Sequence, residues 1–448
     1  MFARNTAARV ARIVDRARVE LRDAMAYSAA GRVARVTLGL GAALACIGRE
    51  ARIVGQASLL RLLEPGALRR RVVSQLQRSI AEQPAAVIRA HAAASGGGRD
   101  GAAATRTTLL KAPGPHGERG VIYSAFEYNW VRLLEGIGDL QELLRDYDVI
   151  WATSWSPTDY LDLARIIASA GPHGLIYVQG SNFGETPQLT EFHPRIRVVP
   201  NLLCEYLDPA SFETRASDVR DIDLLVVSNW APFKRHFELF RALRHMPASL
   251  RVVCVGQPER GHTRASIEQL AVAYGVPQAI EFLESLPLVE VRSLQARSKA
   301  AAIFSRREGS CVAAVEALFA GASLGLIDGA QVGSTAFVNA STGVALRPAH
   351  LSEDLLRLIT DAPKRSPREW AQAHLGADRA TQKLNAWLKE RAVERELPWA
   401  TDIVRMSWSP YPWVASAGAR AELGPAVAAL HARFPKVFGA GLLDESRY

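Results

Sequence analysis

The sequence predicts an α/β protein with two doubly wound domains that face a cleft, preceded by a basic helical extension. The chain has 448 residues, which is more than one hydrophobic core usually serves. From residue 119, short apolar runs alternate with helical segments, and this alternation starts again at 222. Such alternation is typical of parallel strands joined by crossover helices.

The extension, residues 1–110, carries all of the net positive charge. It has 18 Arg, no Lys and 7 acidic residues, whereas the rest of the chain has 36 basic and 38 acidic residues. The extension begins with apolar residues at helical spacing, and the pattern of residues 65–94 also predicts helix. The apolar residues of the first pattern are Val10, Ile13, Val14, Ala17, Leu21 and Met25.

Three interpretations of this extension remain open. Residues 1–95 could contact an anionic membrane surface, the first helix could simply pack on its own protein, or the segment could be a targeting peptide. Acidic residues such as Asp15 and Glu20 argue against a targeting peptide, because these are normally poor in acids.

Two α/β halves follow the extension. Residues 111–220 contain the strand candidates "GVIYSAF", "DVIWAT", "GLIYVQG" and "IRVVPN", and residues 221–365 contain "IDLLVVSN", "LRVVCVG", "AIEFLE", "AAAIFS" and "SLGLID". Residues 366–448 read as a helical region that packs back across the domains. Ligands of such sheets bind outside the carboxyl ends of the strands.

Composition excludes several classes. Four cysteines lie far apart, at Cys46, Cys204, Cys254 and Cys311, so neither a zinc site nor a disulfide framework is indicated. No apolar run reaches the roughly 20 residues that span a bilayer. We expect a cytoplasmic protein, with peripheral attachment to the inner membrane face as an alternative, and no nucleic-acid partner.

Charged residues follow the strands of the second half at their carboxyl ends. Lys234 and Arg235 open a helix, where a cation adds to the free backbone N–H groups that bind phosphate. Glu308 follows a later strand, and Glu316 lies eight residues beyond it in an apolar helix. A buried carboxylate there requires donors such as sugar hydroxyls. Each residue also has a purely structural interpretation. Lys234 could be a solvated helix charge, Glu308 a carboxylate favoured by the helix dipole alone, and Glu316 a structural helix glutamate. Other residues assigned to ligand binding are Gly256, Gly309, Ser310 and Cys311.

This arrangement resembles the C-terminal domain of family-4 glycosyltransferases (glycosyl transferases group 1) with the GT-B fold of two Rossmann-like domains. The resemblance covers roughly 119–350 and includes the Glu-x7-Glu pattern at Glu308 and Glu316. It implies that Glu308 contacts the donor sugar, Glu316 the nucleotide ribose and Lys234 the diphosphate. Further matches are Pro200, Asn201, Asp208 and Phe212 in the hinge, and Gly333, Ser334, Thr342 and Gly343 in late loops.

The sequence also departs from the family pattern. Asn229 stands where an arginine is usual, so that Arg235, or else Arg306 or Arg307, is expected to supply the second positive charge. Asn229 itself is expected either to contact the donor or to cap the backbone. The glycine-rich loop expected after the first strand of the N-terminal domain is replaced by "SAFEYNW".

The resemblance implies an enzyme that transfers a sugar from a nucleotide diphosphate sugar to a glycan or lipid-linked acceptor, with retention of configuration. It implies no metal and no cofactor besides the donor substrate. The catalytic residues expected are Glu308, Lys234 and Arg235. Two alternatives remain: a catalytically inert nucleotide-sugar-binding scaffold, and a GT-B epimerase or phosphorylase.

Overall fold

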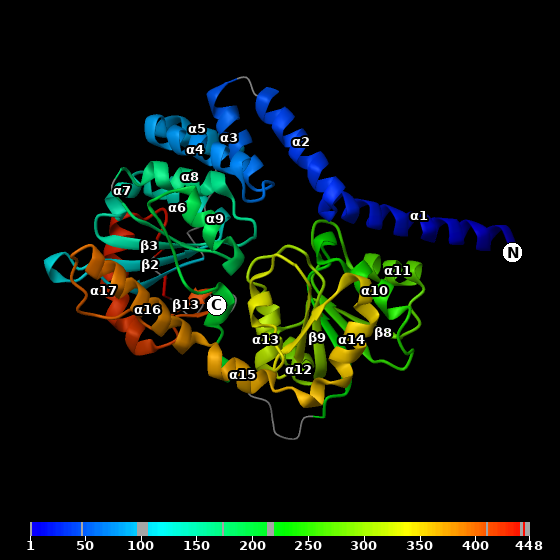
Figure 1. The fold of residues 1–448 in the computed structure, drawn as a ribbon. Helices are drawn as coiled ribbons and strands as arrows, with labels where there is room; N and C mark the ends of the chain where they lie inside the picture. Colours follow the sequence, from blue (N-terminus) through cyan, green and yellow to red (C-terminus); the bar gives the residue numbers. More distant parts are fainter. Residues whose placement is uncertain are drawn as a thin grey trace. The chain divides into compact units, whose positions relative to one another are not determined.

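A computed structural model describes residues 2–45, 48–95, 106–172, 174–212, 219–408, 411–439 and 442–443. The chain forms two compact units (Figure 1). Unit 1 comprises Met1–Arg32 and Pro209–His374, and unit 2 comprises Val33–Asp208 and Leu375–Tyr448. The predicted fold class is confirmed, because both units are α/β with mainly parallel strands and the N-terminal region is helical.

The units divide the chain differently from the predicted domains. The extension 1–110 does not form a body of its own: its first helix belongs to unit 1, and its later helices belong to unit 2. The C-terminal region is also divided, after His374. Backbone bonds fix this second boundary, because the N–H groups of Gly376 and Ala377 donate to the carbonyls of Glu205 and Leu207 in unit 2.

Unit 1 is built on a six-stranded sheet with the order β11-β10-β9-β6-β7-β8, in which every neighbouring pair is parallel. Its strands are β6 (Ile222–Val227), β7 (Val252–Gly256), β8 (Ile280–Glu284), β9 (Ser298–Ile303), β10 (Ser323–Ile327) and β11 (Gly343–Leu346). Its helices are α1 (Phe2–Tyr27), α10 (His236–Leu243), α11 (Arg264–Tyr274), α12 (Leu288–Ala296), α13 (Val312–Phe319), α14 (Leu351–Thr360) and α15 (Pro367–His374).

Side chains of β6 alternate between two cores, as expected for a sheet covered on both faces. Leu224 and Val226 pack with residues of α10, α11 and α14, whereas Leu225 packs with Val291 and Leu294 of α12. The apolar run predicted at the start of this unit is therefore a mostly buried strand with one face in each core.

The strand order of unit 1 reverses between β6 and β9. The chain proceeds from β6 through β7 to β8 on one side, and then from β9 through β10 to β11 on the other. At such a reversal the loops after the two central strands diverge, which leaves a crevice for a ligand at their carboxyl ends. The loops concerned are 228–235 after β6 and 304–311 after β9.

Unit 2 contains a five-stranded sheet in consecutive order, β1-β2-β3-β4-β5, with β1 antiparallel to β2 and the others parallel. Its strands are β1 (Thr107–Lys111), β2 (Gly120–Ala125), β3 (Tyr147–Ala152), β4 (Ile176–Gln179), β5 (Ile196–Val198), and the pair β12 (Ser407–Trp408) and β13 (Pro412–Trp413). Figure 1 shows α6, α8 and α9 on one side of this sheet and α16 and α17 on the other.

The helices of unit 2 come from the later part of the N-terminal extension, from the α/β half 111–220 and from the C-terminal region. They are α3 (Arg49–Leu60), α4 (Ala67–Glu82), α5 (Pro84–Ala94), α6 (Glu127–Ile137), α7 (Leu140–Leu143), α8 (Tyr160–Ser169), α9 (Thr186–Phe192), α16 (Ala377–Glu394) and α17 (Ala417–Arg433). The boundary between the units falls within α2 (Ala29–Ala45), because Arg32 belongs to unit 1 and Val33 to unit 2. Among the described residues, no helix combines the length and the apolar character needed to cross a membrane.

Candidate functional site

Lys234 and Glu308 form an ion pair at the point where the strand order reverses. Lys234 ends the short 3₁₀ turn η5 (Pro232–Lys234) after β6, and Glu308 lies in the loop after β9. Their Nζ and Oε1 atoms are 2.5 Å apart, and both side chains are mostly buried, with exposed fractions of 14% and 6%. Ser305 also donates its hydroxyl to Glu308. The sheet therefore joins a cation and a carboxylate that are 74 residues apart in the sequence.

Electrostatics keep this lysine charged. Burial by itself would lower the pKa of Lys234, but nearby negative groups, chiefly the Glu308 carboxylate, together outweigh burial, and the pKa is raised. The pKa of His236, two residues after Lys234, is lowered instead. Burial, assisted by the Lys234 charge, lowers its pKa to about 3, so that His236 is neutral at physiological pH. One positive charge is thus held at the reversal point.

Arg235 has different partners from those expected for a phosphate-binding arginine. The helix does start late, after Pro232, as an approach to the phosphates requires. However, Arg235 adopts a left-handed conformation with φ 55°, and its side chain is only 2% exposed. Its guanidinium donates to Asp23 at 2.6 and 2.9 Å, to Glu238 at 2.6 Å and to the Phe304 carbonyl at 3.1 Å. Arg235 is therefore a structural link between α1, α10 and the end of β9.

Asn229 and Gly256 have structural roles within unit 1: Asn229 forms a side-chain hydrogen bond, and Gly256 lies in a closely packed position. The Asn229 amide donates to Glu259, whereas its Oδ1 atom is buried without a hydrogen-bond partner among the described residues. Gly256 ends β7, and a Cβ atom there would lie 2.4 Å from the Ser228 carbonyl oxygen and 2.8 Å from the Trp230 ring. The glycine is thus required for packing, whatever its contact with a ligand.

The turn from Glu308 to the start of α13 places small residues at a helix N-terminus. Cys311 precedes the helix in a left-handed conformation with φ 55°. Its thiol stays protonated, because burial, followed by the Glu308 charge, raises its pKa. The Gly309 carbonyl accepts a bond from the Gly333 N–H at 3.0 Å. Two buried serines lie in the same segments: Ser310, which is 7% exposed, follows Gly309, and Ser334 follows Gly333. The Ser334 hydroxyl has no hydrogen-bond partner within the described chain.

Glu316 lies on α13, half-buried. Gln295 donates to its carboxylate at 3.4 Å, which is a long hydrogen bond. Burial raises the pKa of Glu316, and the Gln295 bond and the charge of Arg292 only partly oppose this. A carboxylate so weakly compensated can accept strong hydrogen bonds from a ligand.

The sequence reasoning missed a carboxylate in unit 2. Glu127 follows β2 and accepts bonds from the Ser154 N–H at 3.1 Å and from the Ser154 hydroxyl, at the carboxyl ends of β2 and β3. Burial raises its pKa to about 7. The residue is half-buried, and with this pKa its carboxyl group changes protonation near neutral pH. Its position directly after an apolar run was the signal available in the sequence.

In unit 1 the arginines after β9 are the other cations in the loop of Glu308. Arg306 is half-buried, and its Nε atom has no hydrogen-bond partner in the part of the chain described. Among the described residues, no group of three or more His, Cys, Asp or Glu side chains is placed to hold a metal ion. The loops after β6 and β9 thus offer Lys234, Arg306 and Glu308 beside the N-terminus of α13, and Glu316 lies further along that helix.

Fold and site together define unit 1 as a doubly wound α/β domain with charged side chains at its strand-order reversal. Residues 209–373 match the family model described as glycosyl transferases group 1. The matched residues coincide almost completely with the second segment of unit 1. The predicted resemblance is therefore confirmed for this domain.

Solved structures with a similar fold include three sugar-handling proteins. The pneumococcal O-GlcNAc transferase GtfA, in complex with UDP and GlcNAc, is 14% identical, with 57% of this chain and 54% of that chain covered and a TM-score of 0.43. HepE from Anabaena, in complex with UDP-glucose, is 15% identical, with 60% and 78% covered and a TM-score of 0.46. Sucrose-phosphate synthase from Thermosynechococcus elongatus is 15% identical, with 62% and 74% covered and a TM-score of 0.45. The chain thus spans about half the length of GtfA. A comparison with curated protein sequences gives no match.

Proposed function

We propose that this protein is a glycosyltransferase of the retaining family-4 type, which transfers a sugar from a nucleoside diphosphate sugar to a glycan or lipid-linked acceptor. The observation that carries the proposal is the Lys234–Glu308 ion pair at the strand-order reversal of a glycosyl transferases group 1 domain. In this reaction the bond between the anomeric carbon and the diphosphate breaks, the diphosphate leaves with the electron pair, and an acceptor hydroxyl forms the new bond and passes its proton to the departing diphosphate.

The site suits a departing diphosphate. Negative charge accumulates on the leaving oxygens as the bond breaks, and a fixed cation lowers the energy of that state. Lys234 supplies this charge, together with the helix N-terminus at Gly309 and Ser310. Arg306 replaces Arg235 as our candidate for the second charge, because Arg235 is engaged with Asp23 and Glu238.

The roles proposed for the two glutamates are those that the resemblance implies, and their surroundings are compatible with them. Glu308, paired with Lys234, contacts the donor sugar, where its charge favours a positively charged anomeric centre. Glu316, which has one long hydrogen bond from Gln295, accepts bonds from the ribose hydroxyls. No metal or cofactor enters this proposal.

A thermal-shift screen of nucleoside diphosphate sugars tests the function directly. A donor at about 100 times its Kd should stabilise the protein by about 2.7 kcal/mol, and nucleoside diphosphate release should accompany binding. Donor binding without any turnover would instead favour the inert scaffold. Conversion to an epimer, or phosphate-dependent release of sugar phosphate, would favour the epimerase or the phosphorylase. No stabilisation by any nucleoside diphosphate sugar would refute the proposal.

Replacement of Glu316 by alanine should weaken nucleoside diphosphate binding about 10- to 150-fold, since a hydrogen bond to a charged group contributes about 1.5 to 3 kcal/mol. Isothermal titration calorimetry with the nucleotide measures this change. Because ribose hydroxyls bind the ionised carboxylate, affinity should also fall as the pH falls through the raised pKa of Glu316.

Two controls make the Glu316 prediction specific. Glu290→Ala removes an exposed glutamate from α12 and should leave affinity unchanged. A deoxyribose nucleotide should bind the wild type more weakly, yet should bind the Glu316→Ala variant as well as the ribose form does. Equal losses with the deoxy nucleotide in both proteins would place the ribose elsewhere.

A further inference from the structure

The first helix docks on unit 1 through its polar side. Glu20 accepts a bond from the Tyr274 hydroxyl at 2.9 Å, and Asp23 accepts two from Arg235. The Arg16 guanidinium lies over the Tyr274 ring, 4.9 Å from its centroid. These residues recur at spacings of three and four, so they share one face of α1. An amphipathic helix that serves only packing would bury its apolar face instead.

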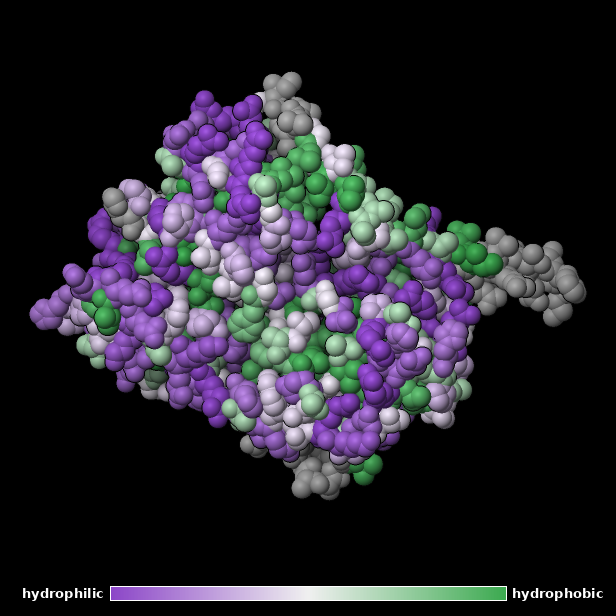
Figure 2. All heavy atoms as spheres, viewed as in Figure 1, coloured by the Kyte–Doolittle hydropathy of each residue, from purple (hydrophilic) through white to green (hydrophobic). Residues whose placement is uncertain are grey.

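The apolar side of α1 is turned to solvent. Ile13, Val14, Leu21 and Met25 have exposed fractions of 55%, 52%, 63% and 63%. At 100° per residue these side chains and Ala17 occupy an arc of about 120°, which begins beside Glu20 at the edge of the docked face and extends away from it. Figure 2 shows hydrophobic residues at the surface along the α1 helix. This concentration of exposed apolar side chains indicates an interaction surface.

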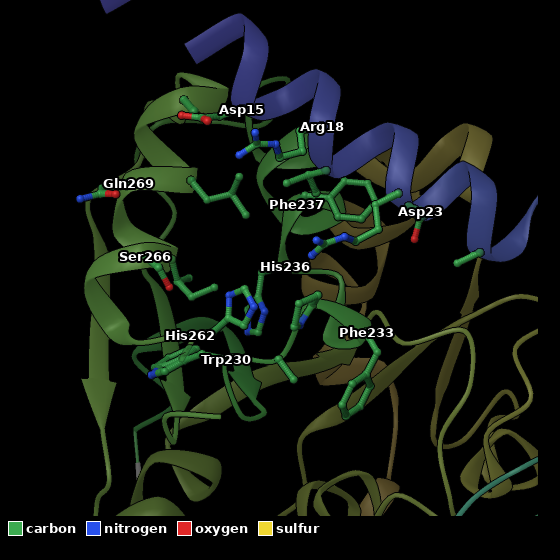
Figure 3. A pocket seen from close by; sticks show the side chains of 18 of the residues that line it. Asp15, Arg18, Asp23, Trp230, Phe233, His236, Phe237, His262, Ser266 and Gln269 are labelled. Carbon is green, nitrogen blue, oxygen red and sulfur yellow. The ribbon is translucent and has the colours of Figure 1, made fainter. Parts of the chain in front are cut away.

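A cavity of about 570 Å³ lies between α1 and unit 1 (Figure 3). Val19 and Ala26 line it from α1, and Phe237 and Leu270 line it from α10 and α11. The helix is thus held over a hollow, largely by the polar bonds to Tyr274 and Arg235. Its outer apolar side chains contribute little to this attachment.

Several acidic and basic residues of α1 also occupy different sides of the helix. Two of its acidic residues, Glu20 and Asp23, are engaged by unit 1. Arg18 and Arg22 are exposed, and their helical positions lie between the apolar arc and the docked face, where they border the cavity. An apolar arc with arginines along its border matches the surface of a membrane that contains anionic lipids, because acyl chains take the apolar residues and headgroup phosphates take the arginines.

We propose that the outer face of α1, namely Ile13, Val14, Ala17, Leu21 and Met25 with Arg18 and Arg22 along one border, binds an anionic phospholipid membrane. The helix lies in the plane of the interface and holds unit 1 there through Asp23–Arg235 and Glu20–Tyr274. This inference does not depend on the proposed sugar transfer.

Flotation of the full chain with lipid vesicles tests it. Wild type should float with vesicles of phosphatidylcholine mixed with phosphatidylglycerol and much less with phosphatidylcholine alone, and added salt should weaken binding, since charges are screened over about 10 Å at about 0.1 M. Leu21→Glu should lower the partition coefficient at least about tenfold. Arg18→Gln should lower it about fivefold on anionic vesicles only.

The matched control is Val289→Glu, which places the same charge at a valine that is 71% exposed on α12, on the other face of the sheet. It should float like wild type. The far-UV circular dichroism spectrum and the thermal unfolding midpoint of Leu21→Glu should equal those of wild type and show that the variant is folded. Wild-type flotation by Leu21→Glu, equal loss in Val289→Glu, or equal binding to neutral vesicles would overturn the proposal. So would binding of a DNA duplex by a protein that no vesicle retains.

Discussion

Replacing Lys234 with alanine is expected to lower the rate of nucleoside diphosphate release from the donor by a factor of about 10² to 10³. This is the usual scale for the loss of one group that stabilises developing charge in a transition state. Lys234 is mostly buried, fixed by Glu308 at 2.5 Å and kept charged by that carboxylate. It therefore needs no reorganisation when the leaving group acquires its charge. Steady-state assays of the donor with wild type and variant measure the effect.

Lys299→Ala is the matched control. Lys299 also belongs to a lysine–carboxylate pair of unit 1, 2.6 Å from Asp223, but it lies at the start of β9, at the opposite end of the sheet. Its removal should leave the release rate within about twofold. Arg306→Ala should lower the rate if it supplies the second charge. A Lys234→Ala variant as fast as the control would place the leaving group away from the reversal point.

Replacing Arg235 with alanine is expected to reduce the free energy of unfolding of unit 1 by about 3 to 5 kcal/mol, the cost of breaking a buried ion pair from one side. Two carboxylates lose their shared partner, Asp23 at 17% and Glu238 at 4% side-chain exposure. The Phe304 carbonyl loses a donor as well. Chemical denaturation, followed by a signal from unit 1, gives the difference.

Arg241→Ala controls for this variant, because Arg241 also pairs with Glu238 but is 43% exposed. Exposed pairs contribute about 0 to 1 kcal/mol, so this variant should remain close to wild type. The two roles considered for Arg235 give opposite results. A protein of unchanged stability whose donor turnover falls about 10² to 10³ fold would restore the direct action on the leaving group.

The sequence by itself determined the alternation of strands and helices, because each buried strand and amphipathic helix has a local period that the chain displays. It also determined which residues follow the strands of unit 1. Lys234 and Glu308 both come directly after an apolar run, and the carboxyl ends of parallel strands share one edge of the sheet. That Glu316 lies on a helix followed from the apolar pattern around it.

Only the tertiary structure decided how these residues pair. The ion pair of Lys234 and Glu308 depends on β6 and β9 being neighbours, and strand order is a property of the whole sheet. The partners of Arg235 depend on its left-handed backbone conformation, φ 55°, which the sequence does not predict because this residue is neither glycine nor asparagine. They depend also on Asp23, which is 212 residues away in the chain. The same pairing decided which side of α1 is docked. Helical period shows that a helix has two faces, but the face that becomes buried depends on the partners that the folded unit presents.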